Sequence, residues 1–273
     1  RLLLRSACTI FVRKFPAMRR KLIIGLCILV VLLAGIGIYL RNGFYGNCVL
    51  ERRSLYVRSG SEYRTLEDSL DAAIAHTAFF RFYARHIELD RSFKPGHYVL
   101  EPGMNIVQVA RMLKLGLQTP VRVTINNVRT PAQLAGKLAR QIEADSATIV
   151  GALTDPATAR KAGFDSVTLF SMFIPDTYEF YWTVSPAQFI ERMRREYDRF
   201  WTPQRDAKRQ RSGLSRLEVM TLASIVYEET RQSDEMPRIA GVYINRLRKG
   251  WPLQADPTVK YALQEFGLRR ILH

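Results

Sequence analysis

The pattern of apolar and polar positions divides the chain near its start. Residues 22–40 form an uncharged run of 19 residues that is rich in Leu, Ile and Val. A bilayer core of roughly 30 Å needs about 20 such residues, so the run predicts a membrane-spanning helix. From residue 41 onward, apolar and polar residues alternate at the spacings of ordinary globular domains. We therefore expect one N-terminal anchor followed by folded domains.

Basic residues flank the apolar run unevenly. Arg19, Arg20 and Lys21 precede it, and only Arg41 follows closely. By the positive-inside rule, this bias places residues 1–21 in the cytoplasm and the chain after Arg41 outside. A cleaved signal peptide is the alternative, but the residues around position 40 lack the small side chains of a cleavage site.

Residues 45–118 predict a compact α+β module of roughly 70 residues. Helical spacing indicates one helix over residues 65–85 and another from about Asn105 to Gly116. Between them, Phe93–Leu100 has the composition of a turn that leads into a strand.

Residues 119–273 predict a second, mixed α/β domain, which makes the whole chain α+β. A strand is expected at 121–125 and a polar linker at 208–215. Helices are expected at 130–142, 146–162 with an interruption at Asp155-Pro156, 186–199, 216–229, 236–247 and 256–263. The segment 174–182 is dense in aromatic and acidic residues. It is either buried packing around a turn or an aromatic wall for sugars, and its composition leaves both open.

The helix predicted from Arg216 ends in two neighbouring carboxylates, Glu228 and Glu229. Its start is marked by a capping box, Ser215-Arg216-Leu217-Glu218. Three apolar residues lie on the same arc as Glu229: Leu222, Ile225 and Val226. We therefore expect Glu229 to be buried, with the raised pKa of a general acid, and Glu228 to be solvated. The alternative is that Glu229 lies merely at the helix edge.

Composition narrows the range of partners. The net charge is +16, and the first 40 residues carry seven basic and no acidic side chains, which leaves +9 for the remainder. A basic surface suits nucleic acid, anionic lipid or cell-wall glycan, and no nucleic-acid-binding signature is present. Cys8, Cys27 and Cys48 fall in three different compartments of the predicted topology, and the four histidines are scattered. We expect neither an intramolecular disulfide nor a metal site.

Several motifs together resemble the YceG-like family of endolytic murein transglycosylases, which are membrane-anchored cell-wall enzymes. The motifs are Ala223–Thr230, Gly241–Leu247, Leu253–Tyr261, Ile174–Tyr178 and Phe93–Tyr98. The resemblance implies a lyase that cleaves glycan strands between N-acetylmuramic acid and N-acetylglucosamine, leaves a 1,6-anhydromuramyl end and so limits nascent strands. It implies no cofactor. It also implies location in the bacterial plasma membrane with the catalytic domain periplasmic, and penicillin-binding synthases as neighbours.

The resemblance also assigns roles to parts of the chain. The family's catalytic glutamate corresponds to Glu229, and residues implied to line the substrate site are Glu235, Gln254, Asp256, Thr258, Asp176 and Tyr178. Residues 45–118 would be a LysM-like module; the alternative, compatible with it, is a spacer that holds the active site away from the bilayer. Residues 119–273 would be the catalytic domain, and we expect it to be incomplete because family members continue beyond this point.

Two features leave other interpretations open. Where the family commonly has Glu-x-Glu-Thr, this chain has Tyr227 in place of the first acid, and Asp256 before Pro257 is also an ordinary helix N-cap. The rival to the enzyme is a non-catalytic, membrane-tethered glycan-binding or scaffold protein of the wall-synthesis machinery.

Overall fold

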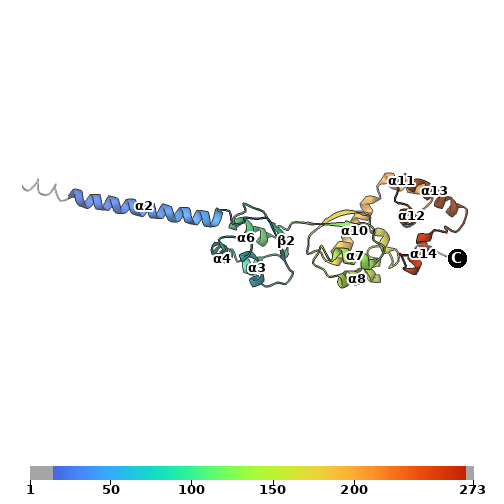
Figure 1. Cartoon of the computed structure of the whole chain (residues 1–273), viewed down its shortest axis with the longest axis horizontal. Helices are drawn as coiled ribbons and strands as arrows, with labels where there is room; N and C mark the ends of the chain where they lie inside the picture. Colours follow the sequence, from blue (N-terminus) through green and yellow to red (C-terminus); the bar gives the residue numbers. More distant parts are fainter. Residues whose placement is uncertain (1–14, 269–273) are drawn as a thin grey trace, which may run out of the picture. The chain divides into compact units, whose positions relative to one another are not determined.

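The computed structural model describes residues 15–268, with side chains from Lys21 onward, and has mixed α+β structure (Figure 1). The predicted α+β class is confirmed. The chain forms two compact units. The first contains the chain up to Val121 and the short segment Tyr181–Thr183, and the second contains Arg122–Phe180 and the chain from Val184 onward.

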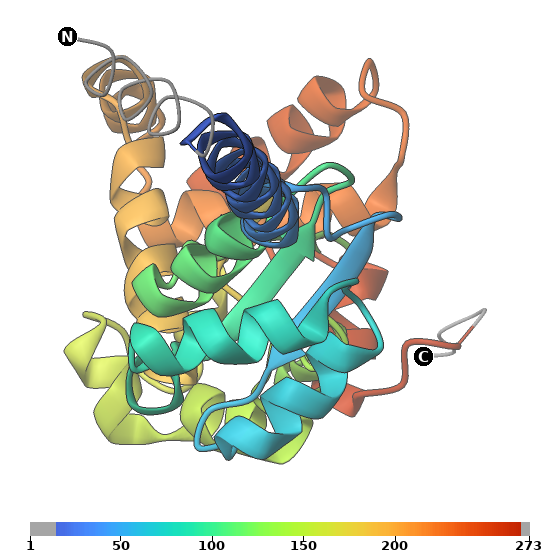
Figure 2. The ribbon, with the colours of Figure 1, turned by 90° about the vertical axis from the view of Figure 1, so that its left-hand side faces the viewer.

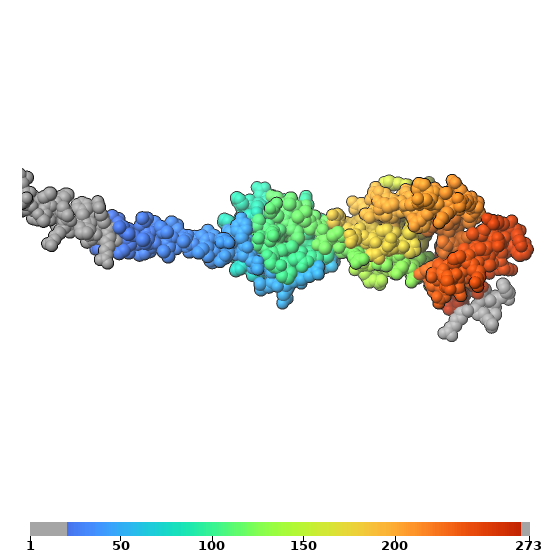
Figure 3. All heavy atoms as spheres, turned by 90° about the horizontal axis from the view of Figure 1, so that it is seen from above, coloured from blue at the N-terminus to red at the C-terminus, as the bar shows by residue number. Residues whose placement is uncertain are grey.

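Helix α2 (Phe15–Tyr45) contains the apolar run. Within the described residues it is the one helix long and apolar enough to cross a membrane, over Lys21–Tyr45 with a mean hydropathy of 2.9. The apolar side chains of the run 22–40 are exposed, and in the view of Figure 3 no other part of the chain covers this stretch of the helix. Length and composition suit a membrane span and a signal sequence alike.

The rest of the first unit is a two-stranded sheet with small helices. Its elements are β1 (Arg53–Val57), α3 (Tyr63–Asp71), α4 (Thr77–His86), α5 (Leu89–Ser92), β2 (Gly96–Leu100) and α6 (Ile106–Leu115). The strands are antiparallel, with Arg53 opposite Leu100 and Val57 opposite Gly96, and Figure 2 shows them side by side. As expected, α6 is capped by Asn105 and ended by Gly116, whose φ of 70° favours glycine.

The predicted single helix over 65–85 is wrong, because the structure divides it into α3 and α4. Between the two helices, His76 adopts a left-handed conformation with φ of 61°. The N–H of Ala75 donates a hydrogen bond to the carbonyl of Cys48 at 2.7 Å and so does not take part in a helix. The side chain of Cys48 is fully buried in the core of this unit, and burial raises the pKa of its thiol to about 11.

The second unit is mostly helical. Its elements are β3 (Val121–Ile125), α7 (Pro131–Leu138), α8 (Ser146–Thr154), α9 (Pro156–Lys161), η1 (Leu169–Met172), β4 (Asp176–Phe180), α10 (Pro186–Phe200), α11 (Pro203–Ser212), α12 (Arg216–Glu229), α13 (Met236–Arg248) and α14 (Asp256–Leu263). Strands β3 and β4 form the sheet. Asp155 separates α8 from α9 and caps α9 by accepting from the N–H of Thr158 at 2.9 Å.

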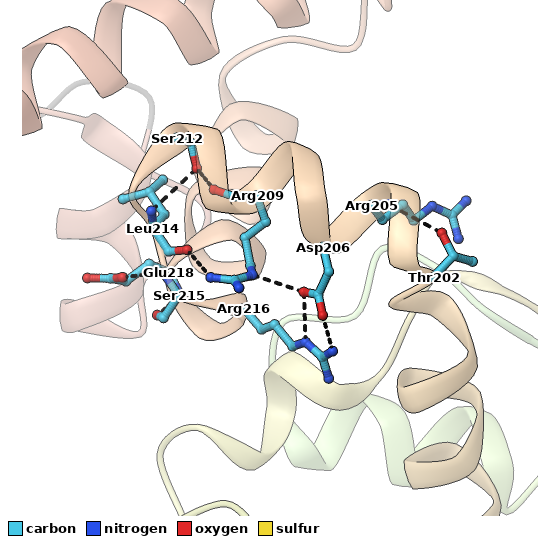
Figure 4. A network of polar contacts seen from close by, with 9 residues as sticks. All are labelled: Thr202, Arg205, Asp206, Arg209, Ser212, Leu214, Ser215, Arg216 and Glu218. Atoms are coloured by element: carbon cyan, nitrogen blue, oxygen red, sulfur yellow. Dashed lines mark hydrogen bonds and ion pairs between the residues drawn. The ribbon is translucent and has the colours of Figure 1, made fainter.

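The expected polar linker at 208–215 is wrong, because most of it belongs to α11. Figure 4 shows what fixes this helix to the start of α12. The carboxylate of Asp206 accepts from Arg209 Nε at 3.0 Å and from the guanidinium of Arg216 through two hydrogen bonds. These arginines, Arg216 foremost, lower the pKa of Asp206 to about 2. Arg209 also donates to the carbonyl of Leu214 at 2.8 Å, which closes the turn between the helices.

Candidate active site

Helix α12 starts and packs as its sequence predicts. Ser215 and Glu218 form the capping box, in which the Ser215 N–H donates to Glu218 Oε2 at 2.7 Å. The three apolar residues of its inner arc are buried and form a small core with Tyr243 of α13 and Ala255 before α14: Leu222, Ile225 and Val226. This core holds the C-terminal end of α12 against the two helices that follow.

Glu229 is the last residue of α12, and its side chain is exposed. The prediction that it is buried is therefore wrong. Glu229 does lie on the same arc of the helix as the buried apolar residues. Because α12 ends at Glu229, however, its side chain is left exposed. The phenol of Tyr243 donates a hydrogen bond to Glu229 Oε1 at 2.8 Å. Burial, and then this hydrogen bond to a carboxylate, raises the pKa of Tyr243 to about 12, so the phenol remains a donor.

Glu228 is the more enclosed of the two acids, so the prediction that it is solvated is also wrong. It is half-buried and receives two hydrogen bonds from Arg129, with Nε 3.2 Å from Oε1 and Nη2 2.8 Å from Oε2. Arg231 adds a longer ion pair at 3.7 Å. Hydrogen bonding to Glu228 raises the pKa of the Arg129 guanidinium. The pair is a structural tie between α12 and the loop that precedes α7.

Two predicted site residues interact with neighbours of Glu229. Asp256 is the first residue of α14 and lies near enough to Tyr243 to raise the pKa of that phenol further. The N-cap of α14 is Ala255, so the N-cap interpretation of Asp256 is wrong by one residue. Glu235 accepts a hydrogen bond from Thr230 Oγ1 at 2.7 Å, directly after the end of α12.

Gln254 and Thr258 belong to the turn into α14. Gln254 has a left-handed backbone with φ of 51°, and its Oε1 accepts from Arg246 at 3.0 Å. Thr258 donates from its hydroxyl to the carbonyl of Ala255 at 2.7 Å. These contacts fix the chain that carries Asp256 beside Tyr243.

Asp176 and Tyr178 lie elsewhere, on β4. Tyr178 is buried, its hydroxyl donates to the carbonyl of Ile174 at 2.7 Å, and burial raises its pKa to about 12. Asp176 is exposed and accepts from the N–H of Thr177 at 2.7 Å. Within residues 15–268, no hydrogen bond or ion pair connects either residue to Glu229. For Tyr178, buried packing is therefore the interpretation that fits. In the same described part of the chain, no group of three or more His, Cys, Asp or Glu side chains is arranged to hold a metal ion.

Comparison with known proteins identifies the family. The sequence profile of the YceG-like family matches residues 55–272, which is most of the chain. The chain belongs to the YceG-like family. The resemblance that the motifs indicate is thereby confirmed.

Relatives of known name are distant. An endolytic murein transglycosylase of Bacillus subtilis is 24% identical over 198 residues, covering 67% of this YceG-like chain and 55% of that protein. One from Streptococcus pneumoniae D39 is 23% identical over 241 residues, covering 77% of this chain and 43% of that protein. The chain thus spans about half the length of the curated relatives it matches.

The fold also has a counterpart among solved structures. A YceG-like protein from Listeria monocytogenes aligns with a TM-score of 0.50 and 24% identity, over 82% of this chain and 78% of that one. This likeness concerns the fold alone.

Sequence reasoning missed the loop that touches the end of α12. Asn127 accepts from the hydroxyl of Tyr227 at 2.8 Å and from Arg231 at 3.4 Å, and the Arg231 guanidinium lies 4.1 Å from the centre of the Tyr227 ring. With Arg129 on Glu228, this loop contacts α12 at two consecutive residues. Tyr227, which replaces the expected acid, therefore has a structural partner in this YceG-like chain. The local signal was Asn126-Asn127, a pair suited to turns, but a turn signal names no distant partner.

Proposed function

We propose that this YceG-like chain belongs to a membrane-anchored lytic transglycosylase that cleaves peptidoglycan strands between N-acetylmuramic acid and N-acetylglucosamine. The observation that carries the proposal is the pair Glu229–Tyr243, an exposed carboxylate held by a buried phenol at 2.8 Å. The family supports the same activity, since both relatives above are named endolytic murein transglycosylases. In this proposal α2 is the anchor, with its N-terminus in the cytoplasm and the remaining chain in the periplasm.

The chemistry explains why one carboxylate suffices. Ordinary glycosidases use two carboxylates separated by roughly 5–9.5 Å, one as acid and one as nucleophile or base. In a lytic transglycosylase, the 6-hydroxyl of the muramyl sugar is the nucleophile. Glu229 gives its proton to the glycosidic oxygen as the bond from that oxygen to C1 breaks. The 6-hydroxyl oxygen then bonds to C1, and its proton returns to Glu229, which leaves the 1,6-anhydro ring and restores the acid.

The geometry around Glu229 suits this role. Tyr243 binds Oε1, and no hydrogen bond among the described residues uses Oε2, which is therefore the oxygen we assign to the substrate. The exposed side chain is reachable by a polymer. Asp256, Glu235, Gln254 and Thr258, around the same helix ends, are the proposed substrate contacts. For Asp176, substrate contact stays a prediction, as do the LysM-like identity of residues 45–118 and a partner synthase.

The test is digestion of purified peptidoglycan by the full chain, with the products resolved by mass. We expect anhydro-ended fragments, and we expect Glu229→Gln to abolish them. Glu218→Gln is the matched control, because it makes the same change at another exposed glutamate of α12. A glutamine at position 218 preserves the capping box. Binding without new chain ends would favour the scaffold protein. Reducing ends without the anhydro ring would indicate a hydrolase.

A further inference from the structure

The last turns of α2 do not lead into a free linker, because α4 packs directly against them. The ring of Phe79 lies 5.3 Å from the ring of Tyr39 and 5.1 Å from that of Phe44, measured between centroids. Position 43 has to be glycine for this approach, since a Cβ there would lie 2.5 Å from ring carbons of Phe79. Aromatic packing therefore joins α4 to α2.

The backbone that follows α2 is fixed as well. The N–H of Cys48 donates to the carbonyl of Met104 at 2.9 Å, and the carbonyl of Cys48 accepts from the N–H of Ala75 at 2.7 Å. The chain enters the folded part of the first unit within three residues of the end of α2 at Tyr45. So short a connection, bonded on both sides, leaves α4 little freedom to move away from α2.

The position of Tyr39 along α2 determines where α4 lies relative to the bilayer when α2 spans it. At 1.5 Å per residue, the uncharged run 22–40 is about 28 Å long, close to the thickness of a bilayer core. Tyr39 lies at the outer end of this run, where aromatic side chains favour the boundary between lipid and water. Since Phe79 contacts Tyr39, α4 lies at that boundary whenever α2 spans a membrane.

One face of α4 has the chemistry of a membrane-surface helix. Phe82 is 68% exposed although its ring lies 6.0 Å from that of Phe44. Arg85 and His86 follow three and four positions later, on the same face, and both are exposed. An aromatic side chain beside basic ones is the combination that enters the headgroup region. Arg81, in contrast, is paired with acidic side chains of α3.

We propose that this face of α4 docks on the lipid surface of the membrane that α2 crosses, with Phe82 in the interface and Arg85 facing lipid phosphates. A lipid surface is the occupant because the face adjoins the membrane-spanning surface of α2 and carries cations beside its exposed ring. The proposal rests on α2 being the anchor. Its consequence is that the first unit lies on the membrane and does not stand off from it.

The test places a photoreactive benzoylphenylalanine at single positions of the full chain in nanodiscs that contain anionic lipid. Position 82 is the probe, and position 33, inside the apolar run, reports the anchor. Leu117 is the matched control, because it is an exposed apolar residue, at 59%, of the same unit. Leu117 lies near the end of β2 that is remote from α2, where the N–H of Thr119 donates to the carbonyl of His97. Beyond the other end of β2, the N–H of Gly103 donates to the carbonyl of Val49, which follows α2 closely in the sequence.

We expect lipid adducts at positions 33 and 82 and few at position 117. Arg85→Glu should lower the yield at position 82 about fivefold, from loss of attraction to anionic lipid, while Arg58→Glu, beyond the far end of β1, should not. Adducts at 33 with none above the level of position 117 at 82 would overturn the docking and leave the anchor intact. No adducts at 33 would overturn both. Protein adducts in place of lipid at 82 would also overturn the docking.

Discussion

The hydrogen bond between Tyr243 and Glu229 gives the sharpest test of the proposed active site. In Tyr243→Phe the ring that fills the core between α12 and α13 stays, and the phenol that donates to Glu229 Oε1 at 2.8 Å is lost. Glu229 keeps its place at the end of α12. It loses the contact that selects one orientation of its carboxylate. Tyr243 is a positioning residue in this scheme, because it is buried and reaches the reaction only through Glu229.

The size of the effect follows from the burial of the two partners. A hydrogen bond to a charged group contributes about 1.5–3 kcal/mol. Because Glu229 is exposed and water replaces part of the lost bond, we take the lower end, about 1.5 kcal/mol, which is roughly a tenfold change in rate. We therefore expect kcat to fall about tenfold with KM nearly unchanged. The melting temperature should fall by no more than about 4 °C, since the phenol is the single group removed.

The assay follows release of anhydro-ended fragments over a range of substrate concentrations. Tyr261→Phe, which removes a phenol from an exposed tyrosine of α14, is the control for the chemical change. If Tyr243→Phe keeps the wild-type kcat while Glu229→Gln is inactive, the hydrogen bond does not position the acid and the reasoning fails. A rise in KM with constant kcat would also refute it, because that result would mean that Tyr243 touches the substrate.

Two further predictions concern stability. Arg216 and Arg209 lower the pKa of Asp206 from 3.8 to about 2, so the stabilisation is present above about pH 4 and is lost as pH falls toward 2. Asp206→Asn should therefore melt below the wild type at pH 7, and the two melting temperatures should converge near pH 2; a constant difference would contradict this. A double-mutant cycle of Arg129→Met and Glu228→Gln should give a coupling of about 0.5–1 kcal/mol in urea unfolding, since both side chains are partly exposed. The coupling should shrink in about 1 M salt, and a value that stays constant would show that it is not an ion pair.

The sequence predicts α12 well up to its last turn. The capping box and the apolar arc depend on neighbours three or four residues away, so Ser215, Ile225 and Val226 could be placed without a structure. The burial of Glu229 could not, because it depends on whether another element covers the end of the helix. The same limit applies to the split between α3 and α4, which a hydrogen bond from Ala75 to a distant carbonyl accompanies.

The surroundings of the two acids depend on still longer separations. Arg129 lies 99 residues before Glu228, and Tyr243 lies 14 residues after Glu229 on another helix. A local sequence pattern does not identify partners at such separations. Helical spacing and the family resemblance both select Glu229, and the structure shows that Tyr243 is its hydrogen-bond partner.

The alkylation rate of the Cys48 thiol can measure how fast the first unit opens. Its thiol is fully buried, and with a pKa of about 11 only about one thiol in a thousand is ionised at pH 8. A thiol-specific reagent therefore modifies it at the rate at which this part of the unit opens. Because the backbone of Cys48 is bonded to Met104 and Ala75, the openings counted are those that would free α2 from the folded chain behind it. Cys27 is exposed on α2, and the mass of its peptide distinguishes its modification from that of Cys48. The rate of Cys48 alkylation in the intact protein therefore measures how fast the contact between α2 and the folded chain opens.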